Sequence, residues 1–540
     1  MKIAHIVIKN HARVADLDLS CRDHVVLVGP NASGKTTILH LLDAVLGARP
    51  SWLNSRFDTR DLRERDEPIL VEVCLVDLDA QDRAHFAGKA QAGTGDKKQE
   101  WLTIRLTAKR SSVDEDELDI DRSFVRPQVA DVRVTNPDID RIGWTLVAAT
   151  RAPDRELGRS RSGVVRSLLH SVDLASTEQE MIGGAYEALT QALQSTESLA
   201  SLRADLATEL GRLFPTTVEP GDVHIDLPEG AAETPLDGLD VLLSDSTGSR
   251  FSLNEQSDGL RSLSVLAAQL LASRSARILA IDEPELHLHP RSQANLARSL
   301  ASSGGQRILS THAPAVLTQF APVDVVAVTQ SGCRQLGRAT LDTKSKTYQH
   351  WWVDGPLEPL TAQRVILVEG VSDRILVEAV ATHLKCDLHR KGVTVFSLGG
   401  ASNFASAIRL FGPTGFDLPL LGLVDEAEAS IPAKALNVDP SDLGDHHFEV
   451  CRTDLEEEYV RALGVSAVID LLDASGLFTE KAILKRFEAA TADDVDQNDL
   501  LGLLRKKKVE AATALAETMT LEQATSIVVL KDLVEMASAD

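Results

Sequence analysis

The sequence predicts an α/β fold in which apolar strands end in glycine turns or carboxylates and lead into helices. Three stretches carry this prediction: a glycine-rich loop at Gly29–Thr37, an apolar strand running into Asp282, and a series of similar strands after residue 360. Ligands of open α/β sheets bind at the carboxyl ends of the strands. We therefore expect the chemistry of this chain at these strand ends.

The first stretch fits the phosphate-loop pattern G-x-x-x-x-G-K-[ST], with an apolar strand at 25–28 before it and a helix-like run at 38–42 after it. The two glycines let backbone amides turn toward an oxyanion, and the helix adds its positive N-terminal end. In this pattern the lysine reaches the β- and γ-phosphates and the next hydroxyl holds Mg²⁺. A glycine-rich turn that merely contains a lysine is the weaker reading in this context. The predicted ATP-binding residues here are Gly29, Asn31, Gly34, Lys35, Thr36 and Thr37.

The second half of a nucleotide site follows at Arg277–Glu285, where an apolar strand ends in Asp282-Glu283. We expect Asp282 to hold Mg²⁺, directly or through water. Glu283 is the candidate catalytic base that orients and deprotonates the water attacking the γ-phosphate. An apolar strand followed by Asp-Glu is a weak signal alone, but it becomes strong downstream of a good phosphate loop.

Composition limits the classes of protein that fit. A length of 540 residues suggests roughly three domains, and 56 basic against 80 acidic residues give a net charge of −24. Such a charge argues against indiscriminate coating of nucleic acid or anionic membrane but leaves room for a local basic groove or for bound metal ions. Five scattered cysteines without a C-x-x-C pair suggest a reducing cytoplasmic location. No run of 18 apolar residues occurs, so we expect no membrane span.

Changes of pattern along the chain suggest four segments. Residues 1–154 mix β-like stretches, at 69–78 and 101–108, with the phosphate-loop helix, and residues 155–220 show helical periodicity that suggests an inserted dimerisation arm. Residues 221–355 return to β-like patterning. A linker-like stretch at 355–359 precedes an α/β unit with C-terminal helices at 360–540.

Several motifs resemble ABC-type ATPases of the SMC/RecF branch: the segment 282–290, the triplet Ser310-Thr311-His312, and the divergent signature at 254–261. The resemblance implies that His312 senses the γ-phosphate and that Ser257 and Gly259 reach the nucleotide of a partner subunit, so that ATP promotes a homodimer. Asp258 stands where many relatives have Gly, which puts this engagement in doubt. His287 and His289 form an H-x-H pair, but no third metal ligand is evident. No heptad array lies between the two halves of the site, so we expect no long coiled-coil arm.

The C-terminal third shows a different chemistry. Glu369 follows an apolar strand, Asp373 opens the next helix, and Asp425 ends a later apolar strand. Carboxylates collected at the ends of parallel strands suit Mg²⁺ or Mn²⁺. Two such ions can activate a water and stabilise the leaving oxygen in phosphodiester cleavage.

This series resembles the TOPRIM domain, and its place after an ABC ATPase resembles the OLD (overcoming lysogenization defect) family of ATP-dependent nucleases. The resemblance implies that Glu456 is a further metal ligand and that Lys508 is the catalytic lysine, although Lys506 and Lys507 adjoin it. Arg151 matches a recurrent arginine of the family, without a role that we can derive. Where TOPRIM expects Asp-x-Asp this chain has Asp425-Glu426-Ala427, so the second ligand is missing. Glu428 or Glu426 is the possible substitute, and strand alternation would turn Glu426 away.

Three function classes follow. The favoured one is an ATP-coupled, Mg²⁺- or Mn²⁺-dependent DNA endonuclease or nickase in phage defence or DNA repair, acting as a homodimer or larger homo-oligomer, with a separately encoded helicase-like partner left open. The second is an ATP-gated DNA-binding sensor or assembly protein with a degenerate TOPRIM site. A topoisomerase or primase fits poorly, because the three tyrosines lie in no recognisable nucleophile domain and zinc-binding cysteines are lacking.

Overall fold

The computed structural model describes residues 1–92, 100–112, 117–126, 129–149, 276–286, 288–302, 304–337, 351–352 and 357–539, with shorter pieces between 168 and 269. The chain divides into two compact units. The first comprises Met1–Leu146, Ala276–Glu285 and Pro290–Asp540, and the second comprises Val147–Ser275 and Leu286–His289. In the second unit the described elements include helix α6 (Ser176–Gln194) and the paired strands β10 (Leu242–Ser244) and β11 (Arg250–Ser252). The four segment boundaries expected from the sequence stay predictions.

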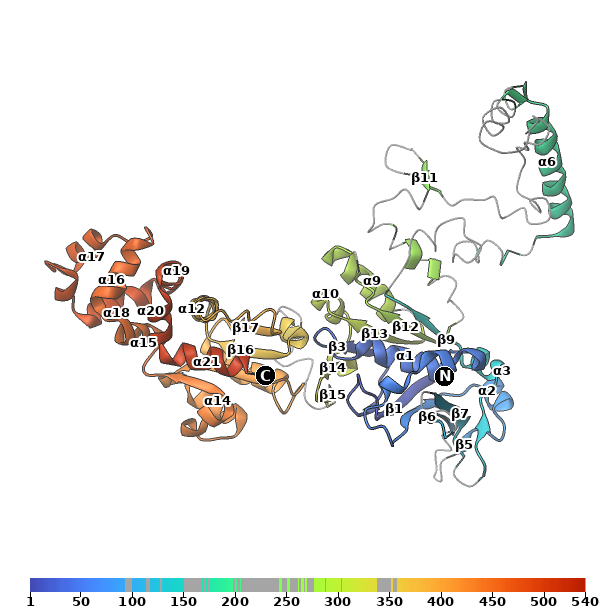
Figure 1. The fold of residues 1–540 in the computed structure, drawn as a ribbon, viewed down its shortest axis with the longest axis horizontal. Helices are drawn as coiled ribbons and strands as arrows, with labels where there is room; N and C mark the ends of the chain where they lie inside the picture. Colours follow the sequence, from blue (N-terminus) through green and yellow to red (C-terminus); the bar gives the residue numbers. More distant parts are fainter. Residues whose placement is uncertain are drawn as a thin grey trace, which may run out of the picture. The chain divides into compact units, whose positions relative to one another are not determined.

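An antiparallel sheet opens the chain. Its strands are β1 (Lys2–Lys9), β2 (Leu17–Ser20), β4 (Ile69–Val76), β5 (Gln91–Ala92), β6 (Glu100–Arg110), β7 (Leu118–Phe124) and β8 (Val132–Arg133). They run in the order β2-β1-β4-β6-β7-β8, and β5 pairs with β6 (Figure 1). Along β4 and β6 buried apolar residues alternate with more exposed ones, which is the pattern of strands with one face on a core. The two β-like stretches expected at 69–78 and 101–108 are β4 and β6.

A second sheet carries the nucleotide motifs. Its strands are β3 (Val25–Val28), β9 (Trp144–Val147), β12 (Ile278–Asp282), β13 (Gln306–Thr311), β14 (Val325–Thr329) and β15 (Gly332–Gln335), in the order β15-β14-β3-β13-β12-β9. The central strands β14, β3, β13 and β12 are parallel. Thr311 pairs with Val28 and Ser310 pairs with Asp282, so the carboxyl ends of β3, β13 and β12 meet at one edge.

The phosphate-loop helix α1 (Lys35–Leu46) contacts strands of both sheets and shares one apolar core with them. Arg122 of β7 closes the far end of this helix, because its guanidinium donates to the carbonyls of Ala44 (2.8 Å) and Ala48 (2.7 Å). Ala44 lies in the last turn of the helix, where carbonyls lack partners within the helix, and Ala48 lies just beyond its end. Further helices of this part are α2 (Ala80–His85), α3 (Asn136–Ile142), α9 (Pro290–Ser302) and α10 (Pro314–Leu317).

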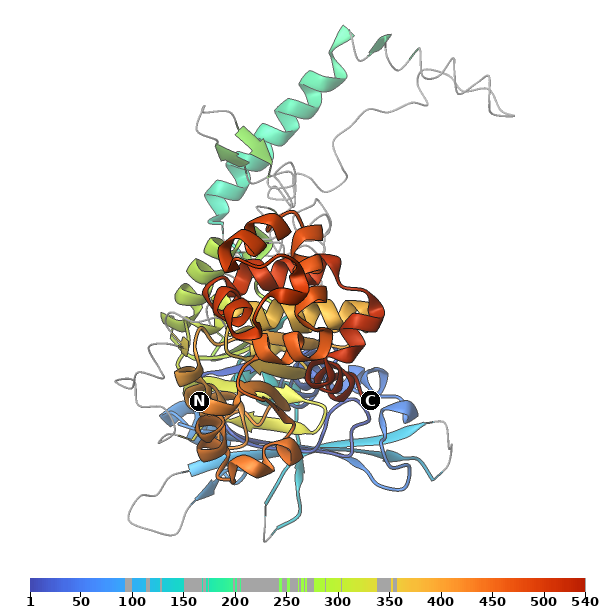
Figure 2. The ribbon, with the colours of Figure 1, turned by 90° about the vertical axis from the view of Figure 1, so that its left-hand side faces the viewer.

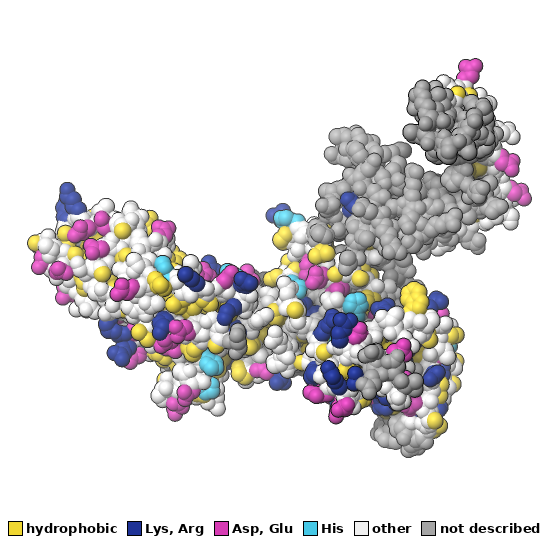
Figure 3. All heavy atoms as spheres, in the orientation of Figure 1, with side chains coloured by type: hydrophobic (Ala, Val, Ile, Leu, Met, Phe, Trp, Pro, Cys, Tyr) yellow, Lys and Arg dark blue, Asp and Glu magenta, His cyan; other side chains and the backbone are white. Residues whose placement is uncertain are grey.

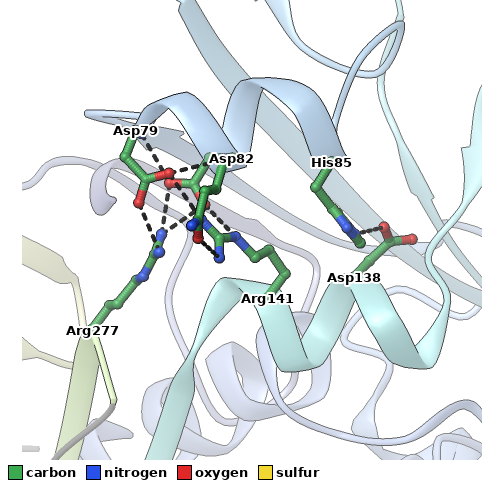
Figure 4. A network of polar contacts seen from close by, with 7 residues as sticks. Asp79, Asp82, His85, Asp138, Arg141 and Arg277 are labelled. Atoms are coloured by element: carbon green, nitrogen blue, oxygen red, sulfur yellow. Dashed lines mark hydrogen bonds and ion pairs between the residues drawn. The ribbon is translucent and has the colours of Figure 1, made fainter.

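An ionic network ties α2 and α3 to the start of β12 (Figure 4). Asp82 is fully buried and accepts from Arg141 (2.6 Å) and from Arg277 (2.6 Å), the residue that precedes β12. Asp79 binds the same two arginines at 2.8 Å each. The strand that ends in Asp282 is thereby anchored at its opposite end.

The C-terminal part contains a four-stranded parallel sheet. Its strands are β16 (Arg364–Val368), β17 (Val393–Ser397), β18 (Leu420–Asp425) and β19 (Phe448–Cys451), in the order β17-β16-β18-β19. Helices α12 (Val371–His383) and α21 (Val528–Ser538) pack on this sheet and share an apolar core with it. Gly422 of β18 cannot carry a side chain, because a Cβ there would lie 2.2 Å from the ring of Phe448. Helices α13 (Phe404–Phe411) and α14 (Ser430–Leu436) complete the α/β unit.

A group of C-terminal helices follows the last strand (Figure 2). Helix α19 packs along α12, so this group reaches the sheet edge at which α12 begins. Within the described ranges, no helix combines the length and the apolar character needed to cross a bilayer. The helices are α15 (Leu455–Leu463), α16 (Val465–Ala474), α17 (Glu480–Phe487), α18 (Gln497–Lys506), α19 (Lys508–Thr518) and α20 (Leu521–Ser526).

Candidate functional sites

A cavity of about 890 Å³ lies at the carboxyl edge of the parallel nucleotide sheet. The predicted loop residues from Asn31 to Thr37 line it, together with Glu283 and His312. Its volume is in the range of pockets that bury a nucleotide-sized ligand. The cavity is also lined by residues that the sequence did not single out: Ala12, Arg13, Val14, Ala15, Asp16, Arg63, Thr329, Gln330 and Ser331.

The two loop glycines are required by space and by backbone conformation. A Cβ on Gly29 would lie 2.1 Å from the carbonyl oxygen of Val328, in the neighbouring strand. Gly34 has φ +97°, and a Cβ there would lie 2.7 Å from the carbonyl oxygen of Arg13. Only glycine accepts both constraints, so the loop can close over a phosphate.

Lys35 is buried, and its ammonium group lies within the loop itself. It donates to the carbonyls of Gly29 (3.0 Å) and Pro30 (2.8 Å) and lies 3.4 Å from the hydroxyl of Ser33. Burial lowers the pKa of Lys35 to about 8, although Glu283 and Asp282 favour its charged form. The charge is therefore held at the place where the motif needs it.

Asp282 joins the phosphate loop to the second half of the site. Its carboxylate accepts from the hydroxyl of Thr36 at 3.1 Å and from the hydroxyl of Ser310. The Thr36 hydroxyl and the Asp282 carboxylate, 246 residues apart in the sequence, are the pair from which the sequence predicted a Mg²⁺ site. A carboxylate and a hydroxyl are hard oxygen donors, so the residues fit this ion.

Glu283 adopts a left-handed backbone conformation with φ 44°, which is unusual for a residue with a side chain. Its amide donates to the carbonyl (3.1 Å) and hydroxyl (3.2 Å) of Ser310, which hold the turn in place. The Glu283 carboxylate lies 3.7 Å from Nε2 of His312. Burial, followed by the charge of Lys35, lowers the pKa of His312 to about 4, so this imidazole is neutral at pH 7. The carboxylate of Glu283 and the neutral imidazole of His312 therefore lie side by side, where each can form a hydrogen bond with a water molecule.

Glu285 is a residue whose role the sequence reasoning missed. Its Oε1 accepts from the hydroxyl of Thr311 and from the backbone amide of His312, both at 2.7 Å. The turn that carries Glu283 is therefore bonded directly to the turn that carries His312. Glu285 is the second Glu of the motif Asp-Glu-Pro-Glu, so the sequence marked its position. Its partners Thr311 and His312 come next to it only because β12 pairs with β13.

Several predicted residues lie outside the described ranges. These are Ser257 and Gly259 of the signature, with Asp258 between them, as well as His287 and Arg151. Their roles stay predictions from the resemblance.

The second candidate site lies at the carboxyl edge of the C-terminal sheet. Burial raises the pKa of Asp425 to about 7; the ammonium of Lys508 opposes this shift, and Asp373 and Glu369 add to it. Burial and neighbouring carboxylates also raise the pKa of Glu369, where Asp373 contributes most after burial. Burial raises the pKa of Asp373 and of Glu456 as well, again against the charge of Lys508. The acidic residues predicted as ligands therefore interact with one another and with the predicted lysine.

Lys508 begins α19, and its ammonium lies 3.2 Å from the buried Oε2 of Glu456. Burial opposes its charge, but Glu456, and after it Asp425 and Asp373, outweigh this effect and raise the pKa of Lys508. The sequence left the choice among three adjacent lysines open. The position of this ammonium favours Lys508.

The structure adds contacts for two of the acidic residues at this edge. Strand β18 ends at Asp425 and a 3₁₀ turn begins at Glu426, so strand alternation does not set the direction of Glu426. Instead, its carboxylate accepts from the amide of Thr453 at 3.2 Å. Glu428 is near enough to contribute to the raised pKa of Glu369, which favours it over Glu426 as the substitute ligand. Asp373 also has a structural role, because it accepts from the Gly370 amide (2.8 Å) at the start of α12.

Mg²⁺ and Mn²⁺ prefer carboxylate oxygens as ligands, and a bound cation would relieve the repulsion among these carboxylates. The chemistry of this cluster therefore fits such ions. Within the described residues, however, no three side chains of His, Cys, Asp or Glu converge on one point as they stand. Side-chain rotation would be needed to complete a coordination shell.

The comparisons with known proteins concern the two domains that carry these sites. Residues 25–318 match the family described as "AAA domain, putative AbiEii toxin, Type IV TA system", and residues 360–426 match "Overcoming lysogenization defect protein-like, TOPRIM domain". A curated protein named OLD nuclease, from Thermus scotoductus, is 24% identical over 452 residues, which are 78% of this chain and 82% of that protein. The chain belongs to the OLD family. It combines an ATPase domain, matched by the AAA-domain model, with a TOPRIM domain, in the order that the sequence motifs predicted.

Solved structures were also found. The C-terminal region of the Burkholderia pseudomallei OLD protein is 26% identical, with a TM-score of 0.27, and covers 33% of this chain and 99% of that chain. The SMC head domain from Thermotoga maritima is 14% identical, with a TM-score of 0.33, and covers 62% of this chain and 100% of that chain.

Proposed function

We propose that this OLD-family chain is an ATP-hydrolysing, metal-dependent DNA endonuclease or nickase that serves in phage defence or DNA repair. The proposal rests on acidic residues placed at one sheet edge: Glu369 follows β16, Asp373 lies in the first turn of α12, and Asp425 ends β18. Lys508 joins them through its contact of 3.2 Å with Glu456. The same chain carries a cavity lined by Asn31 to Thr37, Glu283 and His312, which supports nucleotide binding.

In the nucleotide pocket, Lys35 and the loop amides would bind the ATP phosphates, while Thr36 and Asp282 would hold Mg²⁺. Glu283 would accept a proton from the attacking water, and neutral His312 would donate to the γ-phosphate. Hydrolysis forms a bond from the water oxygen to the γ-phosphorus and breaks the bridging bond to the β-phosphate oxygen, which leaves on ADP.

At the TOPRIM edge, Glu369, Asp425, Glu456 and Glu428 are the proposed metal ligands, and Asp373 is a ligand or a support of the α12 turn. A bound Mg²⁺ or Mn²⁺ supplies positive charge and lowers the pKa of a bound water. Lys508 would balance charge that builds up on the phosphate as the water oxygen bonds to phosphorus and the sugar oxygen leaves.

The test is a plasmid nicking assay with Mg²⁺ or Mn²⁺, with and without ATP, that compares wild type, Glu369→Ala and Glu522→Ala. Glu522 is an exposed glutamate of α20 and serves as the matched control. We expect wild type and the control to nick DNA and Glu369→Ala to lose at least about 100-fold in rate. Equal nicking by all three would refute the assignment.

A second function keeps a specific observation in its favour. Ala427 replaces the second TOPRIM aspartate, and no three described ligands converge. An ATP-gated DNA-binding sensor or assembly protein would show Lys35-dependent ATP turnover without cleavage in any metal. The same assay separates the two functions, since only the nuclease relaxes the plasmid. Both versions of the proposal include homo-oligomer formation, and both leave open whether a separately encoded helicase-like partner is required.

A further inference from the structure

The chain carries its longest run of basic residues beside the TOPRIM carboxylates. Arg505, Lys506, Lys507 and Lys508 are consecutive, in a protein with a net charge of −24. In the view of Figure 3, basic and acidic side chains are interspersed over the described surface rather than forming one extended basic face. An anionic ligand that approaches this chain therefore depends on local groups of positive charge.

The two ends of the run are held by acidic residues at the start of α15. Arg505 donates from Nε to Asp454, the residue that caps α15, at 2.5 Å. Lys508 lies 3.2 Å from Glu456, the second residue of the same helix. These two contacts fix the backbone of the run against the carboxylate cluster.

The two lysines between them have no comparable acidic partner among the described residues. Lys506 ends α18 and Lys507 separates α18 from α19, and both are exposed. Lys507 lies 3.7 Å from exposed Glu510 and 5.9 Å from the ring centre of Phe478, contacts that hold a surface lysine only weakly. Chain geometry keeps both Cα atoms within about 7 Å of the Cα of Lys508.

We propose that Lys506 and Lys507 form a phosphate-binding rim, which holds the DNA backbone next to the phosphate that the carboxylate cluster would cleave. This inference rests on the proposed nuclease function. The acidic cluster repels a phosphodiester, and Lys508 is already engaged with Glu456. Lys506 and Lys507 are exposed, and the contacts of Lys507 are weak, so their charges can attract a phosphate beside this cluster. If the run were only a solvated surface segment, Arg505 and Lys508 would not need their bonds to Asp454 and Glu456.

The test uses the salt dependence of DNA binding. Affinity of the full-length protein for a fluorescent duplex is measured in EDTA, which prevents cleavage, from 50 to 200 mM KCl. Each phosphate contact contributes about 0.9 to the slope of log K against log salt, so Lys506→Gln/Lys507→Gln should reduce the slope by about 1.8. The affinity that wild type loses across this salt range should then shrink by about tenfold in the variant.

Controls separate a rim from a general charge effect. Lys481→Gln/Lys485→Gln makes the same charge change at exposed positions on α17 and should leave the slope unchanged. Lys506→Arg/Lys507→Arg should preserve it, and ATP hydrolysis should be unaffected in all variants.

Two results would overturn the rim: an unchanged slope in the first variant, or an equal reduction in the α17 variant. A wild-type protein that binds no duplex overturns the rim and the proposed function together. A protein that nicks plasmid while the first variant keeps the wild-type slope overturns the rim alone.

Discussion

Replacing Asp425 by Asn should stabilise the metal-free protein at alkaline pH, although Asp425 is a proposed ligand. Asp425 ends β18, where burial raises its pKa to about 7, with Lys508 opposing the shift and Asp373 and Glu369 adding to it. Folding therefore disfavours the ionised carboxylate. Asparagine has nearly the same shape without the charge.

The magnitude follows from the pKa. A carboxyl whose pKa moves from 3.8 to about 7 on folding corresponds to about 4 kcal/mol at full strength. Because Asp425 is only partly buried, solvent screening reduces this to about 1–2 kcal/mol. The pKa of Asp425 is higher in the folded protein than in the unfolded chain, so ionisation of this carboxyl costs more in the folded state. Its contribution to folding is therefore least favourable above pH 7. Wild-type stability therefore falls as pH rises from about 4 to about 7, and the advantage of the variant is complete above that window.

The assay is thermal unfolding in EDTA at pH 8 and at pH 4, monitored for the transition of the TOPRIM domain. At pH 8 the variant should melt about 2–6 °C above wild type, and at pH 4 the two should coincide. Asp445→Asn, at an exposed position of the same domain, is the control and should change neither temperature. Adding Mg²⁺ should raise the melting temperature of wild type more than that of Asp425→Asn. A variant less stable than wild type in EDTA at pH 8 would show that Asp425 is not held against electrostatic repulsion.

Three further outcomes follow from the described contacts. Lys35→Ala should abolish ATP binding, measured by titration calorimetry, because the buried ammonium of the phosphate loop is lost. Glu285→Ala should lower the kcat of ATP hydrolysis about tenfold with little change in KM, whereas Glu285→Gln, which keeps an acceptor for Thr311, should retain most of the rate; equal rates in both variants would contradict a positioning role. Asp82→Ala should destabilise the ATPase part by about 2–3 kcal/mol in denaturant unfolding, because two arginines lose their buried partner while Asp79 remains.

Local patterns predicted the parts of each site that depend on a few consecutive residues. The phosphate loop, the strand into Asp282 and the strand that ends at Asp425 all lie where the sequence placed them. Each combines an apolar strand with a polar end, so the signal is contained in about ten residues. Membership of the OLD family could be inferred from the order of such motifs along the chain.

Contacts between distant turns could not be predicted in the same way. The bond from Glu285 to Thr311 depends on the pairing of β12 with β13, and Arg63 enters the nucleotide cavity from a loop that no motif marks. The contact of Glu426 with the amide of Thr453 could not be predicted from strand alternation, because β18 ends at Asp425 and a 3₁₀ turn begins at Glu426. Periodicity describes an element but does not say where the element stops.

The bond between the Glu283 turn and the His312 turn has a consequence for kinetics. Since Glu285 bonds the two turns together, we expect a change in one turn to displace the other. Glu283, proposed to activate water, and His312, proposed to sense phosphate, should then act as one unit. In a double-mutant cycle, the losses caused by Glu283→Gln and His312→Ala should not add, and removal of Glu285 should make them independent. A single glutamate of the strand-end turn would then decide whether the two proposed catalytic residues act together or independently.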